Sequence, residues 1–295
     1  MKELILQIIN GLQLGSIFAL VALGYTMVYG IAKLINFAHG DILMVGAYVA
    51  LASVPMLSSA GLPIWLAVVP SVIFCAVLGM VIEKVAYTPL RNSPRISNLI
   101  TAIGVSLLLQ NVVMTFIGAN PQSFPKVFNV KPLNIFGIKI NFSIIVTILV
   151  TGILTILLQL FLRKTKFGKA MRATSEDYGA SKLVGINVNH TISMTFAIGS
   201  GLAAVGSILY LSAYPQLLPN MGSMMGIKAF VAAVIGGIGN IPGAVLGGLI
   251  LGLVEALTKA YISSQLADAF VFGILIVVLL VKPTGILGEN IKEKV

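Results

Sequence analysis

Long apolar runs dominate this chain, separated by short polar segments. A helix rises 1.5 Å per residue, so about 20 apolar residues cross a bilayer. The runs lack the strict two-residue alternation of an outer-membrane barrel, and a helix satisfies its own backbone groups in lipid. The pattern therefore predicts an all-α, polytopic transmembrane bundle. We expect spans near residues 5–31, 40–59, 63–83, 97–118, 142–162, 191–214, 225–239, 243–261 and 265–281.

The span at 225–239 is the shortest, and it overlaps a glycine-rich stretch at Gly236, Gly237 and Gly239. A half-helix or re-entrant segment fits such a stretch as well as a crossing does. The sequence therefore predicts eight or nine spans, within a single transmembrane domain over residues 1–295.

Composition supports a membrane protein and excludes other classes. Of the 295 residues, 58% are hydrophobic and only 9% are charged, whereas soluble domains carry about a quarter charged residues. A disordered chain or a nucleic-acid module needs more polar sequence, and a disulfide scaffold needs more cysteine than Cys75 alone. The apolar N-terminal run lacks a small-residue cleavage pattern, so we interpret it as a retained span rather than a signal peptide.

The chain has 19 Lys and Arg against 9 Asp and Glu, and in a membrane protein such an excess indicates how the chain is oriented in the bilayer. Most of the basic residues lie in the loops at 32–39, 84–96 and 163–190 and in the tail from 282, which includes Lys292 and Lys294. The positive-inside rule then predicts a cytoplasmic C-terminus and an external N-terminus. Nine crossings fit this parity, and a re-entrant 225–239 would break it. The protein is expected in the cell membrane.

Two loops are longer than simple turns. The extracytoplasmic loop 119–141 contains Pro121, Pro125 and Pro132 and predicts either an ordered docking surface or a plain surface loop. The cytoplasmic loop 163–190 begins with a basic part that can bind anionic headgroups. Its second part predicts a short helix from Ser175 through Val184, either as a surface for a partner protein or as a solvated juxtamembrane helix.

No enzyme constellation is visible in the sequence. His39 and His190 stand apart, without the ligand spacing of a zinc site. Gly168-Lys169 is followed by Ala170 rather than Ser or Thr, so it does not form a phosphate-binding loop. We expect no catalytic residues, metal or cofactor, and any ATP hydrolysis must occur on another subunit.

Polar side chains inside the apolar runs are functional candidates, because burying them in lipid is costly. Glu255 falls near the middle of its span, where it lines a path or bonds a neighbouring helix. Asp41 and His39 stand at the start of the second span, where capping is the ordinary role of an Asp. Gln110 and Asn111 lie deep in the fourth span, and amides there often only bond between helices. Glu83 beside Lys84 suggests a snorkelling pair at a span end.

Several blocks together resemble the branched-chain amino acid ABC transporter permeases of the LivH type. Asn36-Phe-Ala-His-Gly40 and Gly236-Gly-Ile-Gly-Asn240 form the most specific pair. Further similarity lies in residues 14–30, in Arg172-Ala-Thr-Ser-Glu-Asp177 and in Lys282-Pro-Thr-Gly-Ile-Leu-Gly288, so the resemblance covers nearly the whole chain.

The resemblance implies an ABC importer permease fold and a subunit that moves leucine, isoleucine or valine inward by alternating access. It implies four kinds of partner: the lipid bilayer, a second homologous permease, two cytoplasmic ABC ATPases and an extracytoplasmic solute-binding protein. No nucleic acid is expected. The sequence leaves open which amino acid is carried and whether the second permease is identical to this one.

The coupling motif of such importers, Glu-Ala-Ala-x3-Gly, falls on residues 179–185. Gly179 replaces its glutamate and Ser181 its second alanine, while Ala180 and Gly185 match, so Glu176 or Asp177 supplies the acidic contact instead. The candidate translocation path comprises Asn36, His39, Asp41, Gln110, Asn111 and Glu255.

Two alternatives stay open. A permease of the same architecture for urea or a short amide would share these motifs. An autonomous channel or ion-coupled carrier would instead need Glu255 or Asp41 as its proton or sodium site.

Overall fold

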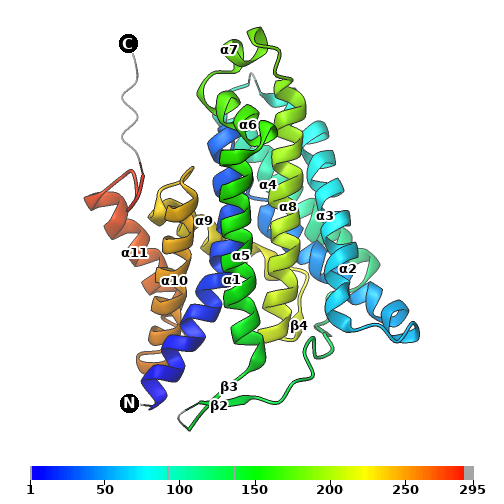
Figure 1. The fold of residues 1–295 in the computed structure, drawn as a ribbon, viewed down its shortest axis with the longest axis vertical. Coiled ribbons are helices and arrows are strands. Elements are labelled where there is room, and N and C mark those ends of the chain that lie inside the picture. Colours follow the sequence, from blue (N-terminus) through cyan, green and yellow to red (C-terminus); the bar gives the residue numbers. More distant parts are fainter. Residues whose placement is uncertain (1, 92, 136, 289–295) are drawn as a thin grey trace.

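The computed structural model describes residues 2–91, 93–135 and 137–288, and these form a bundle of apolar helices (Figure 1). Seven helical segments in the described residues are long and apolar enough to cross a membrane. The α-helices are α1 (Lys2–Ala32), α2 (His39–Ser59), α3 (Val68–Ile82), α4 (Arg95–Phe116), α5 (Phe142–Lys164), α6 (Lys166–Glu176), α7 (Tyr178–Leu183), α8 (Val188–Ala213), α9 (Met221–Gly236), α10 (Ile241–Tyr261) and α11 (Ala267–Val281).

The predicted all-α class is confirmed, and a helix occupies each predicted span. The third span is a composite, since the 3-10 turn Ile64–Ala67 precedes α3, and the π-turn Glu83–Tyr87 and the 3-10 turn Thr88–Leu90 follow it. α9 and α11 are apolar but have only 16 and 15 residues. At 1.5 Å per residue they measure about 24 Å or less, short of a hydrocarbon core of about 30 Å. The choice between eight and nine crossings therefore depends on short helices.

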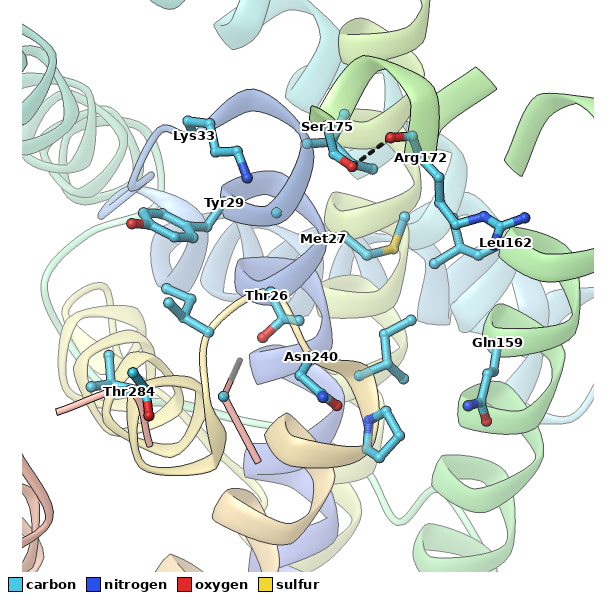
Figure 2. A pocket seen from close by; sticks show the side chains of 18 of the residues that line it. Thr26, Met27, Tyr29, Lys33, Gln159, Leu162, Arg172, Ser175, Asn240 and Thr284 are labelled. Atoms are coloured by element: carbon cyan, nitrogen blue, oxygen red, sulfur yellow. Dashed lines mark hydrogen bonds between the residues drawn. The ribbon is translucent and has the colours of Figure 1, made fainter. Parts of the chain in front are cut away.

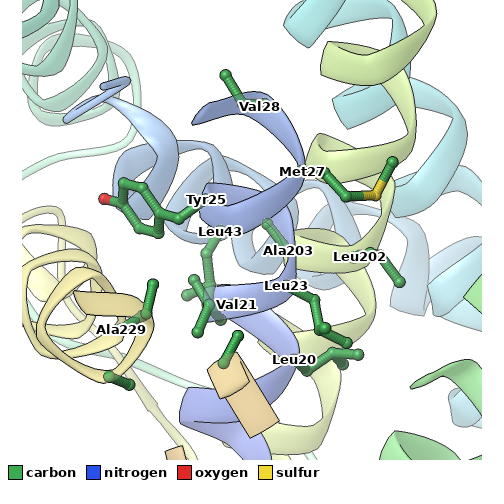
Figure 3. Packing of buried hydrophobic residues seen from close by; sticks show 14 of the residues in the cluster. Leu20, Val21, Leu23, Tyr25, Met27, Val28, Leu43, Leu202, Ala203 and Ala229 are labelled. Carbon is green, nitrogen blue, oxygen red and sulfur yellow. The ribbon is translucent and has the colours of Figure 1, made fainter. Parts of the chain in front are cut away.

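α1 is the central helix of the bundle. It packs against α10, α8, α9 and α5, and its middle turns are completely covered (Figure 3). Ile17, Leu20 and Leu23 have no exposed surface. An all-round apolar sequence is what a helix surrounded by other helices requires, which explains why α1 has no polar face.

Glycines set the distance between α1 and α10. A Cβ atom at Gly248 or Gly252 of α10 would overlap the backbone of Ala19 or Gly15 of α1. Small residues that let helix backbones touch are the usual basis of helix association in lipid. Gly248 and Gly252, four residues apart, form such a small-residue pattern and bring the two backbones into contact.

The loops gather at two opposite ends (Figure 1). At the end with the N-terminus, β1 (Gln122–Ser123) pairs antiparallel with β4 (Gln216–Leu217), in the register Gln122↔Leu217. At the same end β2 (Leu133–Ile135) and β3 (Ile138–Ile140) form a hairpin, with Leu133 opposite Ile140. The loop 119–141 thus has strands of its own, and the strand pair joins it to the segment after α8.

The opposite end carries α6 and α7 and corrects one prediction. The helix expected from Ser175 through Val184 is interrupted at Asp177, whose backbone is extended at φ −154° and ψ 120°. The Asp177 carboxylate accepts a hydrogen bond of 2.9 Å from the Ala180 amide, so Asp177 caps α7 and separates it from α6. Gly185 follows α7 at φ +84°, the conformation expected of a terminating glycine. The predicted tail residues Lys292 and Lys294 lie outside the described residues.

Candidate functional site

Asp41 lies inside the bundle rather than at the mouth of a span. Its carboxylate has no exposed surface and accepts hydrogen bonds from Ser106 Oγ at 2.5 Å and Gln110 Nε2 at 3.0 Å. Gln110 Nε2 also donates to Ser223 Oγ at 2.8 Å. Capping is the wrong role for Asp41, because Ala38 is the N-cap residue and makes no side-chain cap bond. The Asp41 carboxylate instead connects α2, α4 and α9.

Two further path candidates lie beside Asp41. The His39 ring is 1% exposed and meets the Tyr25 ring edge-on at 4.8 Å between centroids. The amide oxygen of Asn36 accepts from the Tyr87 hydroxyl at 2.8 Å and from the Ala38 amide at 3.1 Å. The segment 33–38 therefore folds back into the bundle, and α2 begins below the surface.

Several buried polar atoms here lack a hydrogen-bond partner among the described residues. They are His39 Nε2, the Tyr25 hydroxyl and Asn36 Nδ2. Buried polar groups are normally satisfied, so an unsatisfied cluster calls for an explanation such as water, a ligand or movement. The same region brings Gly40 of α2 so close to Gly222 and Gly226 of α9 that a Cβ at any of them would overlap backbone.

The other two path candidates lie elsewhere. Asn111 is exposed, and its side chain donates to the Leu107 carbonyl of its own helix at 2.8 Å. Glu255 is 2% exposed and binds two lysines through Oε1, Lys228 at 2.9 Å and Lys259 at 2.5 Å. Lys228 also contacts Asp268 at 2.7 Å, so this charge cluster joins α9, α10 and α11. Its central lysine was missed, although a Lys inside an apolar run is itself a signal.

A third buried carboxylate lies toward the α6–α7 end. Glu83 is 1% exposed, pairs with Arg91, and accepts hydrogen bonds from Thr88 Oγ1 at 2.7 Å and from Ser193 Oγ. The predicted surface pair of Glu83 with Lys84 is therefore wrong. Arg91 also donates to Asn189 Oδ1 at 2.6 Å. This network connects the turns after α3 to the beginning of α8.

α7 presents an apolar tip to the surroundings. Leu183 is 90% exposed and Val184 75% exposed, whereas Ser181 is buried. The Tyr178 hydroxyl donates to the Ile31 carbonyl of α1 at 3.0 Å. Burial raises the pKa of Tyr178, against the opposing effect of the Arg91 charge, so this hydroxyl remains a donor. α7 is thus attached to α1 while its apolar tip is exposed.

Below α6 lies a groove of about 600 Å³ (Figure 2). It is bordered by Thr26 on α1, Lys33 directly after α1, Gln159 on α5 and Asn240 at the start of α10. Asn240 caps α10 by accepting from the Gly243 amide at 3.1 Å, and its Nδ2 donates to the Leu287 carbonyl at 2.9 Å. The groove lies between α5 and α10, over the last turns of α1.

Comparison with known proteins shows to which family this chain belongs. A family model described as the permease component of branched-chain amino acid transport systems matches residues 7–280. The chain belongs to this permease family. Three relatives match along nearly their whole length. The permease is 44% identical to the high-affinity branched-chain amino acid transport permease BraD of Pseudomonas aeruginosa and 45% identical to LivH of Escherichia coli K12, in each case over 98% of this chain and 97% of the relative.

A more distant relative extends the comparison. The permease is 32% identical to a probable branched-chain amino acid transport permease of Methanocaldococcus jannaschii, over 94% of this chain and 90% of that one. With its apolar helices, this permease is a multi-pass protein of the inner membrane and a transport subunit rather than an enzyme.

The charge cluster allows a matched test of stability. Lys228 and Lys259 bind the same Glu255 oxygen, but the Lys228 side chain is 10% exposed and that of Lys259 is 43% exposed. Replacing Lys228 by Met leaves a buried carboxylate with less compensation, which costs about 3–5 kcal/mol. Lys259→Met removes a more exposed pair worth about 1 kcal/mol or less. Thermal unfolding of the purified permease should show a much larger loss for Lys228→Met, and equal losses would contradict a central role for Lys228.

Proposed function

We propose that this permease is the membrane subunit of an ATP-driven importer that moves leucine, isoleucine and valine into the cell. The observation that carries the proposal is the 44–45% identity, over 97% of their length, to permeases named for branched-chain amino acid transport. A related permease for urea or a short amide would share the helical architecture. It is not favoured, because these full-length relatives are all named for branched-chain amino acids.

The proposed complex contains a second homologous permease, two cytoplasmic ABC ATPases and an extracytoplasmic solute-binding protein. The absence of a phosphate-binding loop from the sequence supports separate ATPases. The loop 119–141, with its hairpin and the β1–β4 pair, is proposed as the surface for the solute-binding protein. The end with α6 and α7 would then face the cytoplasm, in agreement with its basic residues.

The proposed coupling element is the cytoplasmic loop 163–190, centred on α7. An apolar tip at Leu183 and Val184 suits burial in a cleft of an ATPase, and the fully exposed patch gains most from being covered. Tyr178 connects α7 to the end of α1, so displacement of α7 would reach the core of the bundle. The coupling contacts are proposed to come from Glu176, Asp177, Gly179, Ala180 and Gly185, while Ser181, which is buried, would position α7 rather than contact the ATPase.

The proposed translocation path passes the cluster of Asn36, His39, Asp41 and Gln110. Its support is the concentration of buried polar atoms, three of them unsatisfied, where α2 begins inside the bundle. We restrict the path to these residues, because Asn111 faces outward and Glu255 is engaged by two lysines.

Isolation of the assembled complex tests the transport class. After purification in mild detergent, mass spectrometry should find the permease with two ATPases, and proteoliposomes should take up leucine only with ATP and the solute-binding protein. Uptake of urea with exclusion of leucine would replace the proposed substrate. A homo-oligomer of this chain that transports without nucleotide would contradict the importer class altogether.

Asp41→Asn tests the path. The change keeps the size of the side chain but removes the charge that strengthens the bond from Ser106, and a hydrogen bond to a charged group contributes about 1.5–3 kcal/mol. If the substrate passes this group, leucine uptake should fall about tenfold or more, while the weaker bond from Ser106 lowers the unfolding temperature by only a few degrees. Asn111→Ala serves as the control and should leave uptake unchanged. Normal uptake by Asp41→Asn would exclude the cluster from the path.

Leu183→Asp tests coupling without disturbing the core. Because the Leu183 side chain is 90% exposed, the change should not lower the unfolding temperature of the isolated permease. ATPase binding and ATP-dependent uptake should fall at least tenfold, since a charge replaces an apolar side chain that the ATPase would bury in the complex. Met171 lies in the covered face of α6, so Met171→Ala should instead lower the unfolding temperature of the isolated permease before it affects uptake. Full uptake by Leu183→Asp would remove α7 from the coupling interface.

A further inference from the structure

The groove below α6 is lined by more basic than acidic side chains. Three basic side chains, Lys33, Arg163 and Arg172, line it, together with one acidic residue, Glu176. None of the three cations has a carboxylate within 4 Å among the described residues. They come from three separate segments: Lys33 directly follows α1, Arg163 lies in the last turn of α5, and Arg172 lies within α6. Among the described residues, the groove therefore holds three cations that have no ionic partner.

The backbone at Lys33 supports a role for this side chain. Lys33 has φ +55°, the only positive φ among the described non-glycine residues. A non-glycine residue in the left-handed region is strained and persists where the surroundings require it. Here it ends α1 while the Lys33 side chain borders the groove (Figure 2).

α6 is amphipathic and presents a basic face away from the bundle. Its covered positions, Gly168, Met171 and Thr174, lie against the bundle, and its exposed positions are Lys166, Lys169 and Arg172. Exposed lysines and arginines next to the ends of membrane-spanning helices are suited to the anionic headgroups of the cytoplasmic leaflet. The groove directly below α6 is then at the level where phosphates of the cytoplasmic leaflet are found.

The walls below the groove are apolar and open. On α5, Ile156 lies one turn below Gln159 and is 60% exposed. On α10, Leu246 lies one turn below Pro242 and is 42% exposed. The polar groove thus continues into an apolar surface on both flanking helices, which matches the division of a phospholipid into headgroup and acyl chain.

We propose that this groove binds the headgroup of an anionic phospholipid from the cytoplasmic leaflet, with Lys33, Arg163 and Arg172 around the phosphate and an acyl chain along α5 and α10. Basic pockets between transmembrane helices at the cytoplasmic side are suited to such headgroups. A zwitterionic amino acid fits less well, because its ammonium group would meet three cations and one carboxylate.

Native mass spectrometry of the intact transport complex in detergent tests the site, with phosphatidylglycerol, phosphatidylcholine of the same chain length, or inorganic phosphate added. Phosphatidylglycerol should bind preferentially. Arg163→Gln with Arg172→Gln should weaken its binding about fivefold for each cation removed. The control, Lys164→Gln with Lys169→Gln, removes the same charge from neighbouring exposed positions outside the groove and should have little effect. Arg163→Lys with Arg172→Lys should retain most of the binding and shows that the fold tolerates change there.

Four results would overturn the proposal. Equal losses in the groove and control variants would mean diffuse attraction to a basic surface. Equal binding of phosphatidylcholine would remove the requirement for an anionic headgroup. Inorganic phosphate that competes at the same concentration as the lipid would indicate a free-anion site, and displacement of the lipid by leucine would assign the groove to the substrate.

Discussion

The close approach of α1 and α10 is the constraint on which the rest of the bundle depends. In lipid, no hydrophobic force brings helices together, so van der Waals contact between well-fitted backbones must do so. Gly15, Gly248 and Gly252 remove the side chains that would hold the two helices apart. Once α10 lies against α1, the second glycine face of α10 receives α9, where Gly247 meets the backbone of Ala232. The two glycine faces of α10 thus position it against α1 and α9.

Ion pairs add a second set of contacts between the helices. Lys228 joins α9 to α10 and α11 through Glu255 and Asp268, and Arg91 with Glu83 joins the turns after α3 to α8. Each buried charge has an opposite charge and is therefore costly to separate. The Asp41 carboxylate differs, since its described partners are the neutral groups of Ser106 and Gln110. Among the described residues, Asp41 is thus held by hydrogen bonds alone, whereas Glu83 and Glu255 are held by ion pairs.

Span positions and glycine packing could be predicted from the sequence because both depend on local pattern. The apolar runs predict where the helices lie, and the repeated Gly-x3-Gly spacing indicates which helix faces are in contact. Partners far apart in the chain could not be predicted, because no local rule pairs Lys228 with Glu255 or Glu83 with Arg91. Glu83 shows the error most clearly, since its neighbour Lys84 was the obvious partner and the fold instead selects Arg91.

The segment between α1 and α2 explains how the two ends of the proposed mechanism can be connected. Tyr178 of α7 holds the Ile31 carbonyl at the end of α1, and two residues later Lys33 ends the helix at a positive φ. The chain then turns inward, where Asn36 accepts from Tyr87, and α2 begins with His39 and Asp41. A coil of six residues, 33–38, therefore joins the end of α1 to α2, and it already contains Asn36 of the polar cluster. Because a coil can change its backbone angles more easily than a helix, displacement of α7 has a short route to Asp41 that leaves the glycine-packed helices in place.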